Sequence, residues 1–368
     1  MGKRKDEDAC INGENSKEDD RKRQLLELEL KALEKKYGYE ITTVDKIQAC
    51  TIDTISTGCL GLDLALGNGG MGVGRIYEIY GPEMSGKSTL ADNVIIQAQR
   101  LGHNCLYVDA EASMDKTLLE KYGVDGTKLH YICLSSGEEN LDAALSLIKT
   151  GIFKVVVIDS VAALVPKTET EGNLADTQQP GRQAAMMSRF LRLLTPVASE
   201  TGTIVIFINQ LRMKIGQMGN PETTTGGEAL KYYATGRIDV RGGQSKKSLL
   251  VDDKNGGEVI GHKTEFYVKK NKLAPPHRKA EVKLIYGCGY DHHWEVLGLA
   301  ADIGIVEKTG NWYKYNDKNI GNGELNTLAF LKDAENTEVF KEICGKVMAN
   351  TGLKEIYESH GQQGPMHP

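Results

Sequence analysis

One run of eight residues has the composition of a phosphate-binding loop. It consists of Gly81, Pro82, Glu83, Met84, Ser85, Gly86, Lys87 and Ser88, and Thr89 follows it. The spacing fits G-x-x-x-x-G-K-[ST], placed between an expected strand and an expected helix. In such a loop the backbone N–H groups surround the phosphates, and the lysine reaches the β- and γ-phosphates. The serine hydroxyl suits Mg²⁺, which prefers oxygen ligands. The run therefore predicts a site for ATP and Mg²⁺, with Lys87 in catalysis and Ser88 on the metal.

Two carboxylates at expected strand ends could complete this chemistry. Asp159 follows the apolar run 154–158, where a carboxylate could hold Mg²⁺ directly or through water. Glu111 lies just past the end of another expected strand and is the best candidate for the base that activates the attacking water. Asp109 is the alternative base, and each of these carboxylates could instead have a structural role.

Strands and helices alternate along the part of the chain that must position these residues. Strands are predicted at residues 75–80, 105–108, 128–134, 154–158 and 204–208, and helices at 87–100, 138–149 and 182–194. Apolar β-branched runs between helices favour an α/β fold with a mostly parallel, doubly wound sheet. Such sheets bind ligands at the carboxyl ends of their strands. Here those ends carry the glycine-rich loop, Glu111, Asp159 and Gln210.

The two ends of the chain differ from this core, which is expected at residues 55–287. Residues 1–15 are polar and expected to be disordered, and 16–54 are expected to form an amphipathic helix and a linker. This helix could pack on its own domain or dock on a neighbouring subunit. Residues 288–350 indicate a small α+β domain with a hairpin at 312–320, and the tail 351–368 is expected to be disordered from 358 onward.

The composition excludes several classes of protein. The chain of 368 residues has 45 Lys and Arg against 50 Asp and Glu, a formal net charge of −5. It has no apolar run long enough to span a membrane and no signal peptide, which predicts a cytoplasmic protein. Seven scattered cysteines without a C-x-x-C pair argue against structural zinc and disulfides. Residues 260–283 hold seven Lys or Arg and two Glu, a basic stripe compatible with phosphate binding.

Several longer runs resemble the bacterial RecA recombinase family. They are residues 54–58, 62–67, 81–89, 159–164, 207–210, 212–216 and 220–227. The similarity extends from about residue 20 to residue 345, and the run 220–227 is close to unique to that family. The resemblance implies a RecA-type core with an N-terminal helix used in oligomerisation and a small C-terminal domain.

The resemblance also implies roles for individual residues around the nucleotide. Glu111 matches the catalytic glutamate, and Gln210 matches the glutamine that senses the γ-phosphate and signals to a DNA-binding loop. Lys270 and Lys272 match a pair that reaches the ATP of the adjacent subunit. Asp115 and Tyr286 match positions near the adenine.

Two DNA-binding loops are implied at residues 171–181 and 211–225. The residues expected to contact DNA are Glu171, Gly172, Arg212, Met213, Lys214, Ile215, Gly216, Met218, Asn220, Thr223, Thr224, Gly226 and Gly227. The residue types agree, because Arg212 and Lys214 can neutralise phosphates while Ile215 and Met218 can insert between bases. The alternative is a solvated surface loop with incidental apolar residues.

The implied function is ATP-dependent DNA recombination and repair. The chain would form a helical filament on single-stranded DNA, take double-stranded DNA as second partner, and promote self-cleavage of a repressor in the SOS response. The alternatives are a ring helicase or other motor of the same fold, and a non-catalytic filament scaffold.

Five departures from the family pattern concern DNA binding. The second loop, at residues 216–220, is one residue shorter than is common and lacks an aromatic residue. Glu228 stands where asparagine is usual, and Gly242 and Glu265 replace basic residues. Residues 244–257 form a longer insert, and the acidic tail of many members is missing. Gly242 and Glu265 predict weaker or altered capture of the second duplex, whereas the missing acidic tail predicts that less Mg²⁺ or help is needed for loading on DNA. Together the departures suggest a divergent bacterial or bacteriophage-encoded member.

Overall fold

The computed structural model describes residues 4–38, 41, 43, 52–170, 181–213, 222–252, 257–362 and 364. The chain divides into two compact units, Met1–Ile52 and Asp53–Pro368, which we describe separately. No helix among the residues described is long and apolar enough to cross a bilayer.

The first unit contains one long helix, α1 (Arg4–Tyr37). Its start differs from the expectation that residues 1–15 are disordered and that the helix begins near Ser16. Lysine, arginine, glutamate and aspartate sustain a helix well, and the single Gly13 costs only about 1 kcal/mol. Large apolar side chains of α1 are exposed in this unit, including Leu26, Leu33 and Tyr37.

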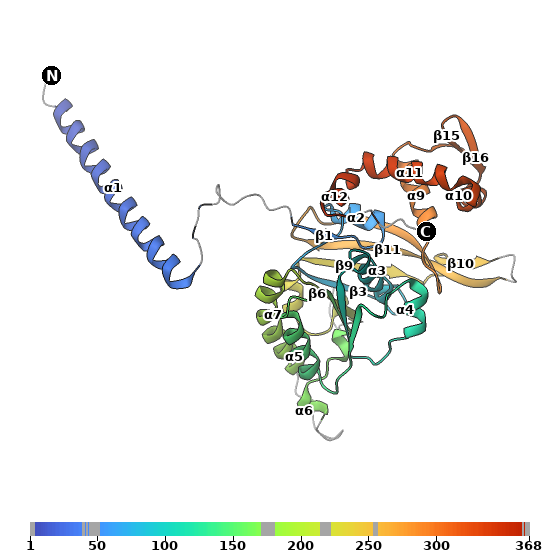
Figure 1. The fold of residues 1–368 in the computed structure, drawn as a ribbon, viewed down its shortest axis with the longest axis horizontal. Helices are drawn as coiled ribbons and strands as arrows, with labels where there is room; N and C mark the ends of the chain where they lie inside the picture. The colour runs from blue at the N-terminus through green and yellow to red at the C-terminus, as the bar shows by residue number, and fades with distance from the viewer. Residues whose placement is uncertain are drawn as a thin grey trace. The chain divides into compact units, whose positions relative to one another are not determined.

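The second unit is built on an eleven-stranded mixed sheet (Figure 1). Its parallel part has the order β9-β3-β7-β6-β4-β5, and an antiparallel extension β13-β12-β11 continues from β9. The parallel strands are β3 (Ile76–Gly81), β4 (Asn104–Asp109), β5 (Leu129–Ile132), β6 (Phe153–Asp159), β7 (Ile204–Met213) and β9 (Gly236–Gly242). The others are β8 (Glu222–Thr224), β10 (Leu249–Asp252), β11 (Glu258–Asn271), β12 (Lys279–Ile285) and β13 (Gly289–Tyr290). The predicted mostly parallel sheet is confirmed.

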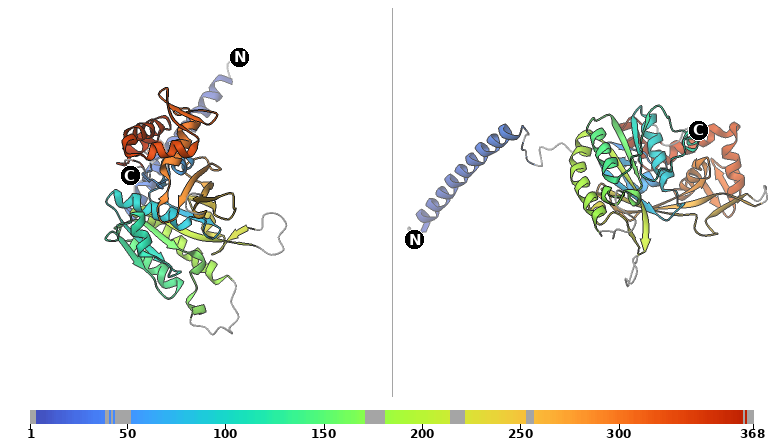
Figure 2. Two further views of the ribbon diagram at one scale, coloured as in Figure 1. Left: turned by 90° about the vertical axis from the view of Figure 1, so that its right-hand side faces the viewer. Right: turned by 90° about the horizontal axis from the view of Figure 1, so that it is seen from below.

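Helices cover both faces of the parallel part (Figure 2). Residues alternate between two cores along each strand, so that Ile206 and Ile208 of β7 lie in one cluster and Val205 and Phe207 in the other. The first cluster includes α3 (Lys87–Arg100) and α4 (Lys116–Tyr122), and the second includes α5 (Gly137–Ile148) and α7 (Arg182–Thr201). Strands buried on both faces explain the continuous apolar runs of the sequence.

A smaller core lies in the C-terminal part of the second unit. That part of the unit contains α9 (His292–Asp302), β14 (Glu307–Thr309), β15 (Trp312–Tyr315), β16 (Lys318–Asn322), α10 (Glu324–Lys332), α11 (Thr337–Asn350) and α12 (Leu353–Ser359), and all of these except β14 contribute to its core. The expected hairpin is confirmed as β15 and β16, and β14 adds a third strand. Asn316 and Asp317 form its tight turn, with φ of 48° and 61°, values that these two residue types tolerate.

The expectation of a disordered tail from residue 358 is wrong for the residues described there. Tyr357, at the end of α12, is 1% exposed, and its hydroxyl donates to Asp63 Oδ2 at 2.6 Å. Gln362 is buried and accepts a hydrogen bond from the Ser56 N–H at 3.0 Å. The polar composition of this tail concealed two side chains that fit the core.

Short elements complete the second unit. They are β1 (Thr54–Ile55), α2 (Leu60–Leu66), β2 (Met71–Gly72), α6 (Lys167–Thr170) and α8 (Ala229–Tyr233). Thr54, expected at the end of the linker, pairs with Gly72 between β1 and β2.

Candidate active site

The glycine-rich loop runs from the end of β3 to the start of α3, as the sequence predicts. Gly81 must lack a side chain, because a Cβ atom there would lie 2.1 Å from the Val240 carbonyl oxygen. Gly86 precedes α3 with a φ of 95°, a left-handed conformation that glycine adopts without strain. The Lys87 ammonium donates to the Pro82 carbonyl at 2.6 Å, so it is folded back along the loop. Burial lowers the pKa of Lys87, although nearby carboxylates oppose this shift.

Asp159 and Ser88 meet at the edge of this loop. The Ser88 hydroxyl donates to Asp159 Oδ2 at 3.0 Å, and Asp159 ends β6 in the parallel sheet. Burial raises the pKa of Asp159, while its hydrogen bonds from Tyr107 and Ser88 oppose the shift. A hydroxyl and a carboxylate this close form an oxygen donor set that suits Mg²⁺. The residues present therefore fit the predicted cation.

Glu111 is connected to the start of the second predicted DNA loop by side-chain hydrogen bonds. Gln210 Nε2 donates to Glu111 Oε1 at 2.9 Å, and Arg212 Nη2 donates to Gln210 Oε1 at 2.8 Å. Ser160 Oγ also donates to Glu111 Oε1. The structure thus brings together Glu111, Gln210 and Arg212, which are 101 positions apart at most in the chain.

Asp109, the alternative base, has its oxygens occupied by structural hydrogen bonds. They accept the backbone N–H groups of Glu111 at 3.1 Å and of Ser113 and Met114 at 2.9 Å each. The Tyr131 hydroxyl adds a fourth bond at 3.2 Å, and Asp109 is fully buried. A carboxylate with these partners shapes the turn after β4, so Glu111 is the better candidate for the base.

The second predicted DNA loop leaves the sheet as a short antiparallel pair. Arg212 of β7 lies opposite Thr223 of β8, and Met213 lies opposite Glu222. Thr224 pairs with Leu211 in the same register. Gly226 and Gly227 follow with φ of 81° and 80°, and a Cβ at either would lie 2.6 Å from a neighbouring side chain. The stem of the loop is therefore fixed at both ends.

Some expected DNA contacts lie outside the described residues. They are Glu171, Gly172, Lys214, Ile215, Gly216, Met218 and Asn220. Their assignments stay predictions.

The pattern of the sequence did not reveal a buried polar cluster beneath this stem. Asn209 Nδ2 donates to Glu78 Oε1 at 2.9 Å, and the Thr225 hydroxyl donates to Asn209 Oδ1 at 2.5 Å. Arg237 closes the cluster through its ion pair with Glu78 at 2.5 Å. Glu78 lies within an apolar strand, and a charged residue there was the one available signal.

Lys270 and Lys272 lie beside the end of α8 in this chain. The Lys270 ammonium donates to the carbonyls of Lys231 at 2.6 Å and Tyr232 at 2.9 Å. Lys272 donates to the Tyr232 carbonyl at 3.3 Å. Desolvation lowers the pKa of Lys270. Their role at the ATP of a neighbouring subunit stays a prediction.

The two residues expected near the adenine have separate structural partners. Asp115 begins α4 as its N-cap, and its Oδ1 accepts the N–H groups of Thr117 at 2.8 Å and Leu118 at 3.2 Å. Tyr286 is partly exposed, and its hydroxyl lies 3.2 Å from His262 Nδ1. His262 is buried and was missed because a lone histidine in a strand carries no pattern.

Asp92 of α3 gives a pH-dependent prediction. Burial raises its pKa from 3.8 to about 8, and the charge of Asp159 adds to the shift. One of its oxygens, Oδ1, has no hydrogen-bond partner among the residues described. As pH rises from about 4 to 8 the unfolded chain loses this proton while the folded chain keeps it. Folding stability then falls by up to about 1.4 kcal/mol per pH unit, and this contribution is constant above pH 8.

We therefore expect Asp92→Asn to be more stable than the parent chain by a margin that grows over that pH window. Urea unfolding at several pH values measures the margin. Asp302→Asn, at an exposed position, serves as the matched control and should give no such trend. A margin for Asp92→Asn that is constant with pH would contradict the raised pKa.

A phosphate-binding loop between β3 and α3, with a carboxylate at the end of nearby β6, defines a P-loop nucleotide-binding protein. A family model described as the RecA N-terminal domain matches residues 24–291, and the RecA C-terminal domain matches residues 294–352. The chain belongs to the RecA family.

Curated relatives are similar in sequence to this chain over nearly its whole length. One from Azoarcus sp. (strain BH72), named Protein RecA, is 46% identical over 341 residues, which covers 92% of this chain and 96% of the relative. Others with that name are 44% identical in Psychrobacter arcticus and 42% identical in Bacillus thuringiensis, covering 94% and 97% of those proteins and 92% of this chain. The chain is thus a DNA-dependent ATPase of DNA recombination and repair.

Proposed function

We propose that this chain forms a helical filament on single-stranded DNA and uses ATP with Mg²⁺ to switch the filament between tight and loose DNA binding. The observation that carries this proposal is the hydrogen-bonded series Glu111–Gln210–Arg212. It connects the candidate base to the first residues of the DNA segment. A γ-phosphate oxygen that competes for the Gln210 amide would alter the position of Arg212, and DNA bound by Arg212 would in turn alter Glu111.

The proposed hydrolysis requires little covalent chemistry from the protein. Lys87 would place positive charge beside the β- and γ-phosphates, and Glu111 would orient and deprotonate the attacking water. Ser160 and Gln210 would hold the Glu111 carboxylate in place. Mg²⁺, when bound by Ser88 and Asp159, supplies charge neutralisation at the phosphate oxygens.

The proposed filament needs an interface that repeats without closing. Lys270 and Lys272 would reach the ATP of the next subunit, so that nucleotide binding favours assembly. Two further surfaces support a contact with a second copy. One is the exposed apolar face of α1, and the other is a groove of about 430 Å³ between α5 and α7.

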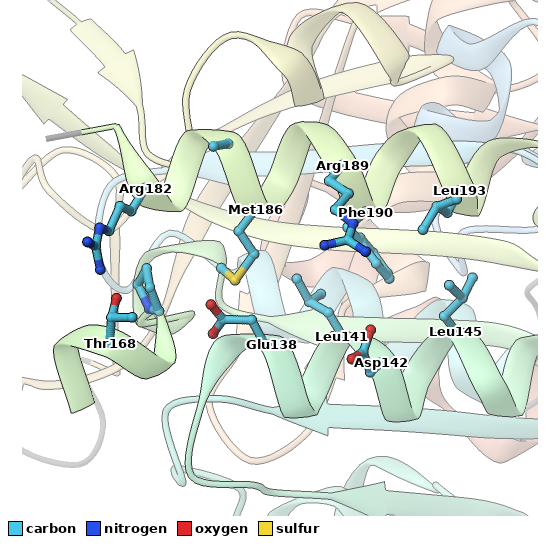
Figure 3. A pocket seen from close by; sticks show the side chains of 12 residues that line it. Glu138, Leu141, Asp142, Leu145, Thr168, Arg182, Met186, Arg189, Phe190 and Leu193 are labelled. Atoms are coloured by element: carbon cyan, nitrogen blue, oxygen red, sulfur yellow. The ribbon is translucent and has the colours of Figure 1, made fainter. Parts of the chain in front are cut away.

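Figure 3 shows how side chains of the two helices face one another across this groove. Leu141 and Leu145 of α5 lie opposite Met186, Phe190 and Leu193 of α7. Charged side chains of both signs border the apolar floor, including Glu138, Asp142 and Arg189. We propose that α1 of a second copy docks there, because its leucines alternate with charged residues of both signs.

The proposed second DNA site is weaker than the count of basic residues suggests. Lys263 and Lys279 both form ion pairs with Glu281, the latter at 3.3 Å. Lys283 pairs with Glu324 at 2.5 Å, so that at least three of the seven basic side chains of residues 260–283 are partly neutralised. This supports the expectation that capture of double-stranded DNA lags behind binding of single strands. The filament would also promote repressor self-cleavage in the SOS response, in the cytoplasm.

The first test is ATP hydrolysis with and without single-stranded DNA at low and high salt. We expect stimulation that fades as salt rises, because binding through phosphates releases counterions. Arg212→Ala should weaken the stimulation and reduce the salt slope of DNA binding by roughly 0.7. Arg192→Ala, at an exposed position on α7, is the matched control and should behave as the parent chain.

The alternatives give different results in the same assay. A closed-ring motor of this fold would hydrolyse ATP without forming open filaments in electron micrographs. A non-catalytic scaffold would form filaments that do not depend on Glu111. Unchanged hydrolysis on addition of DNA, with ATP still bound, would contradict the proposal.

A further inference from the structure

The carboxylate proposed to hold Mg²⁺ is anchored from two sides. Asp159 Oδ2 accepts one hydrogen bond from Ser88 of α3 at 3.0 Å and a second from the Tyr107 hydroxyl of β4 at 2.8 Å. Both bonds end on the same oxygen. Ser88 keeps its lone pairs when it donates its proton, so it can bind a cation at the same time. The Tyr107 hydroxyl is buried away from solvent and donates its hydrogen bond to the Asp159 carboxylate.

Tyr107 is held rigidly where it makes this contact. The residue is 6% exposed and lies in the core cluster shared with Leu90, Ala91 and Val94 of α3. Its strand, β4, is the direct neighbour of β6, and Tyr107 stands opposite Val157 in the parallel register. The phenol therefore reaches the Asp159 carboxylate from an adjacent, fully paired strand. A partner fixed in this way restricts rotation of the carboxylate about its Cβ–Cγ bond.

The surroundings of the phenol are unusually polar for a core position. Asp92 of α3 is also buried, lies close enough to influence Tyr107 electrostatically, and has an unpartnered oxygen among the described residues. The Tyr290 hydroxyl, in the same core cluster, is also buried and has no hydrogen-bond partner among the described residues. Burying an unpaired polar atom costs folding free energy, yet neither of these two groups bonds the Tyr107 hydroxyl, which donates to Asp159. The Tyr107 hydroxyl is thus specific for the carboxylate.

We propose that Tyr107 is a positioning residue for Mg²⁺-dependent nucleotide binding, acting through the orientation of Asp159. The proposal rests on the proposed role of Asp159 as the metal carboxylate. Partners that orient a metal ligand typically contribute about 10- to 100-fold to metal affinity. An apolar strand that needed only packing would be served equally well by phenylalanine. The hydroxyl is the part of Tyr107 to which we assign the function.

The test is Tyr107→Phe, which keeps the ring and removes one oxygen. Affinity for a fluorescent ATP analogue is measured over a Mg²⁺ titration and again in EDTA, well below the unfolding temperature of each variant. We expect the Mg²⁺ concentration for half-maximal tight binding to rise about tenfold, with affinity in EDTA unchanged. Tyr131→Phe is the matched control, because its hydroxyl bonds the Asp109 carboxylate one strand away at 3.2 Å. It should leave the Mg²⁺ titration unchanged.

Asp159→Asn separates this proposal from the one on which it rests. If Asp159→Asn raises the Mg²⁺ requirement while Tyr107→Phe leaves it at the parent value, Tyr107 has no positioning role. If neither variant changes the requirement, Asp159 is not the metal carboxylate and both proposals fail. A loss of affinity in EDTA equal to that with Mg²⁺ would also overturn the proposal, since it would mean a general distortion of the loop.

Discussion

Replacing Glu111 with glutamine is expected to lower DNA-stimulated ATP hydrolysis by about 10²- to 10⁴-fold, while ATP binding and filament formation persist. The side chain keeps its size, and its remaining carbonyl oxygen can still accept from Gln210 and Ser160. It loses the negative charge that orients and deprotonates water. Steady-state phosphate release measures the rate, and a fluorescent ATP analogue measures binding.

Two further variants make this prediction specific. Glu120→Gln, at an exposed position of α4, is the matched control and should hydrolyse ATP at the parent rate. Asp109→Asn should lower thermal stability along with activity, because Asp109 accepts three backbone N–H bonds. Hydrolysis by Glu111→Gln within a few-fold of the parent rate would show that another group serves as the base.

The parallel part of the sheet and the phosphate loop could be predicted because their signals are local. A β-branched run such as residues 154–158, followed by a carboxylate, has few other interpretations. The antiparallel extension has no such local signal. Its strand β11 pairs both with β10, which directly precedes it in the chain, and with β9, which lies before β10. The sequence pattern also did not predict how far β7 extends, since it indicated a strand only at residues 204–208. The strand continues to Met213 because β8 pairs with its polar end.

The residues proposed to act on the phosphates could be predicted from spacing, whereas those that support them could not. Lys87, Ser88, Asp159 and Glu111 follow from the loop motif and the strand ends. Tyr107 was missed because a tyrosine in an apolar strand resembles an ordinary core residue. A hydrogen bond such as that from Tyr107 to Asp159 depends on which strands are neighbours, and one sequence does not state that.

The basic stripe shows that a count of charged residues along the sequence does not give the charge that is available for binding. Counting the residues between 260 and 283 gives seven Lys or Arg against two Glu. The count takes no account of ion pairs: Glu281 pairs with Lys263 of the neighbouring strand β11 and with Lys279 of its own strand β12. Positive charge available to DNA is therefore smaller than the local composition implies.

The C-terminal segment gives the second large effect, on stability. Tyr357 reaches Asp63, which is fully buried and also accepts hydrogen bonds from Ser56 and Thr57. Gln362 donates to the Thr54 carbonyl and accepts from the Ser56 N–H, so it bridges the first strand of this unit. Removing residues 353–368 is expected to cost about 3–5 kcal/mol of unfolding free energy, because it deletes buried Leu353 and Tyr357 and exposes these polar groups. Thermal and urea unfolding measure the loss.

A shorter truncation is the matched control for this prediction. Removing residues 363–368 alone leaves Gln362 and should change the unfolding free energy by less than about 0.5 kcal/mol. Loss of stability in both truncations would place the effect beyond Gln362. Parent stability in both would mean that α12 contributes nothing to this core.

Tyr357→Phe tests the same contact through its pH dependence. Burial raises the pKa of Asp63 to about 7, and the Tyr357 hydrogen bond acts in the opposite direction by favouring the ionised form. Without that bond the folded pKa rises further, so the variant holds its proton over a range in which the parent chain has released it. The variant should therefore lose less unfolding free energy relative to the parent chain near pH 5, where Asp63 is protonated in both. This loss should grow as the pH rises through about 7. If the loss of unfolding free energy does not change with pH, Tyr357 stabilises the fold through packing of its ring alone. In either case Tyr357 and Gln362 act through buried contacts with residues 54–63.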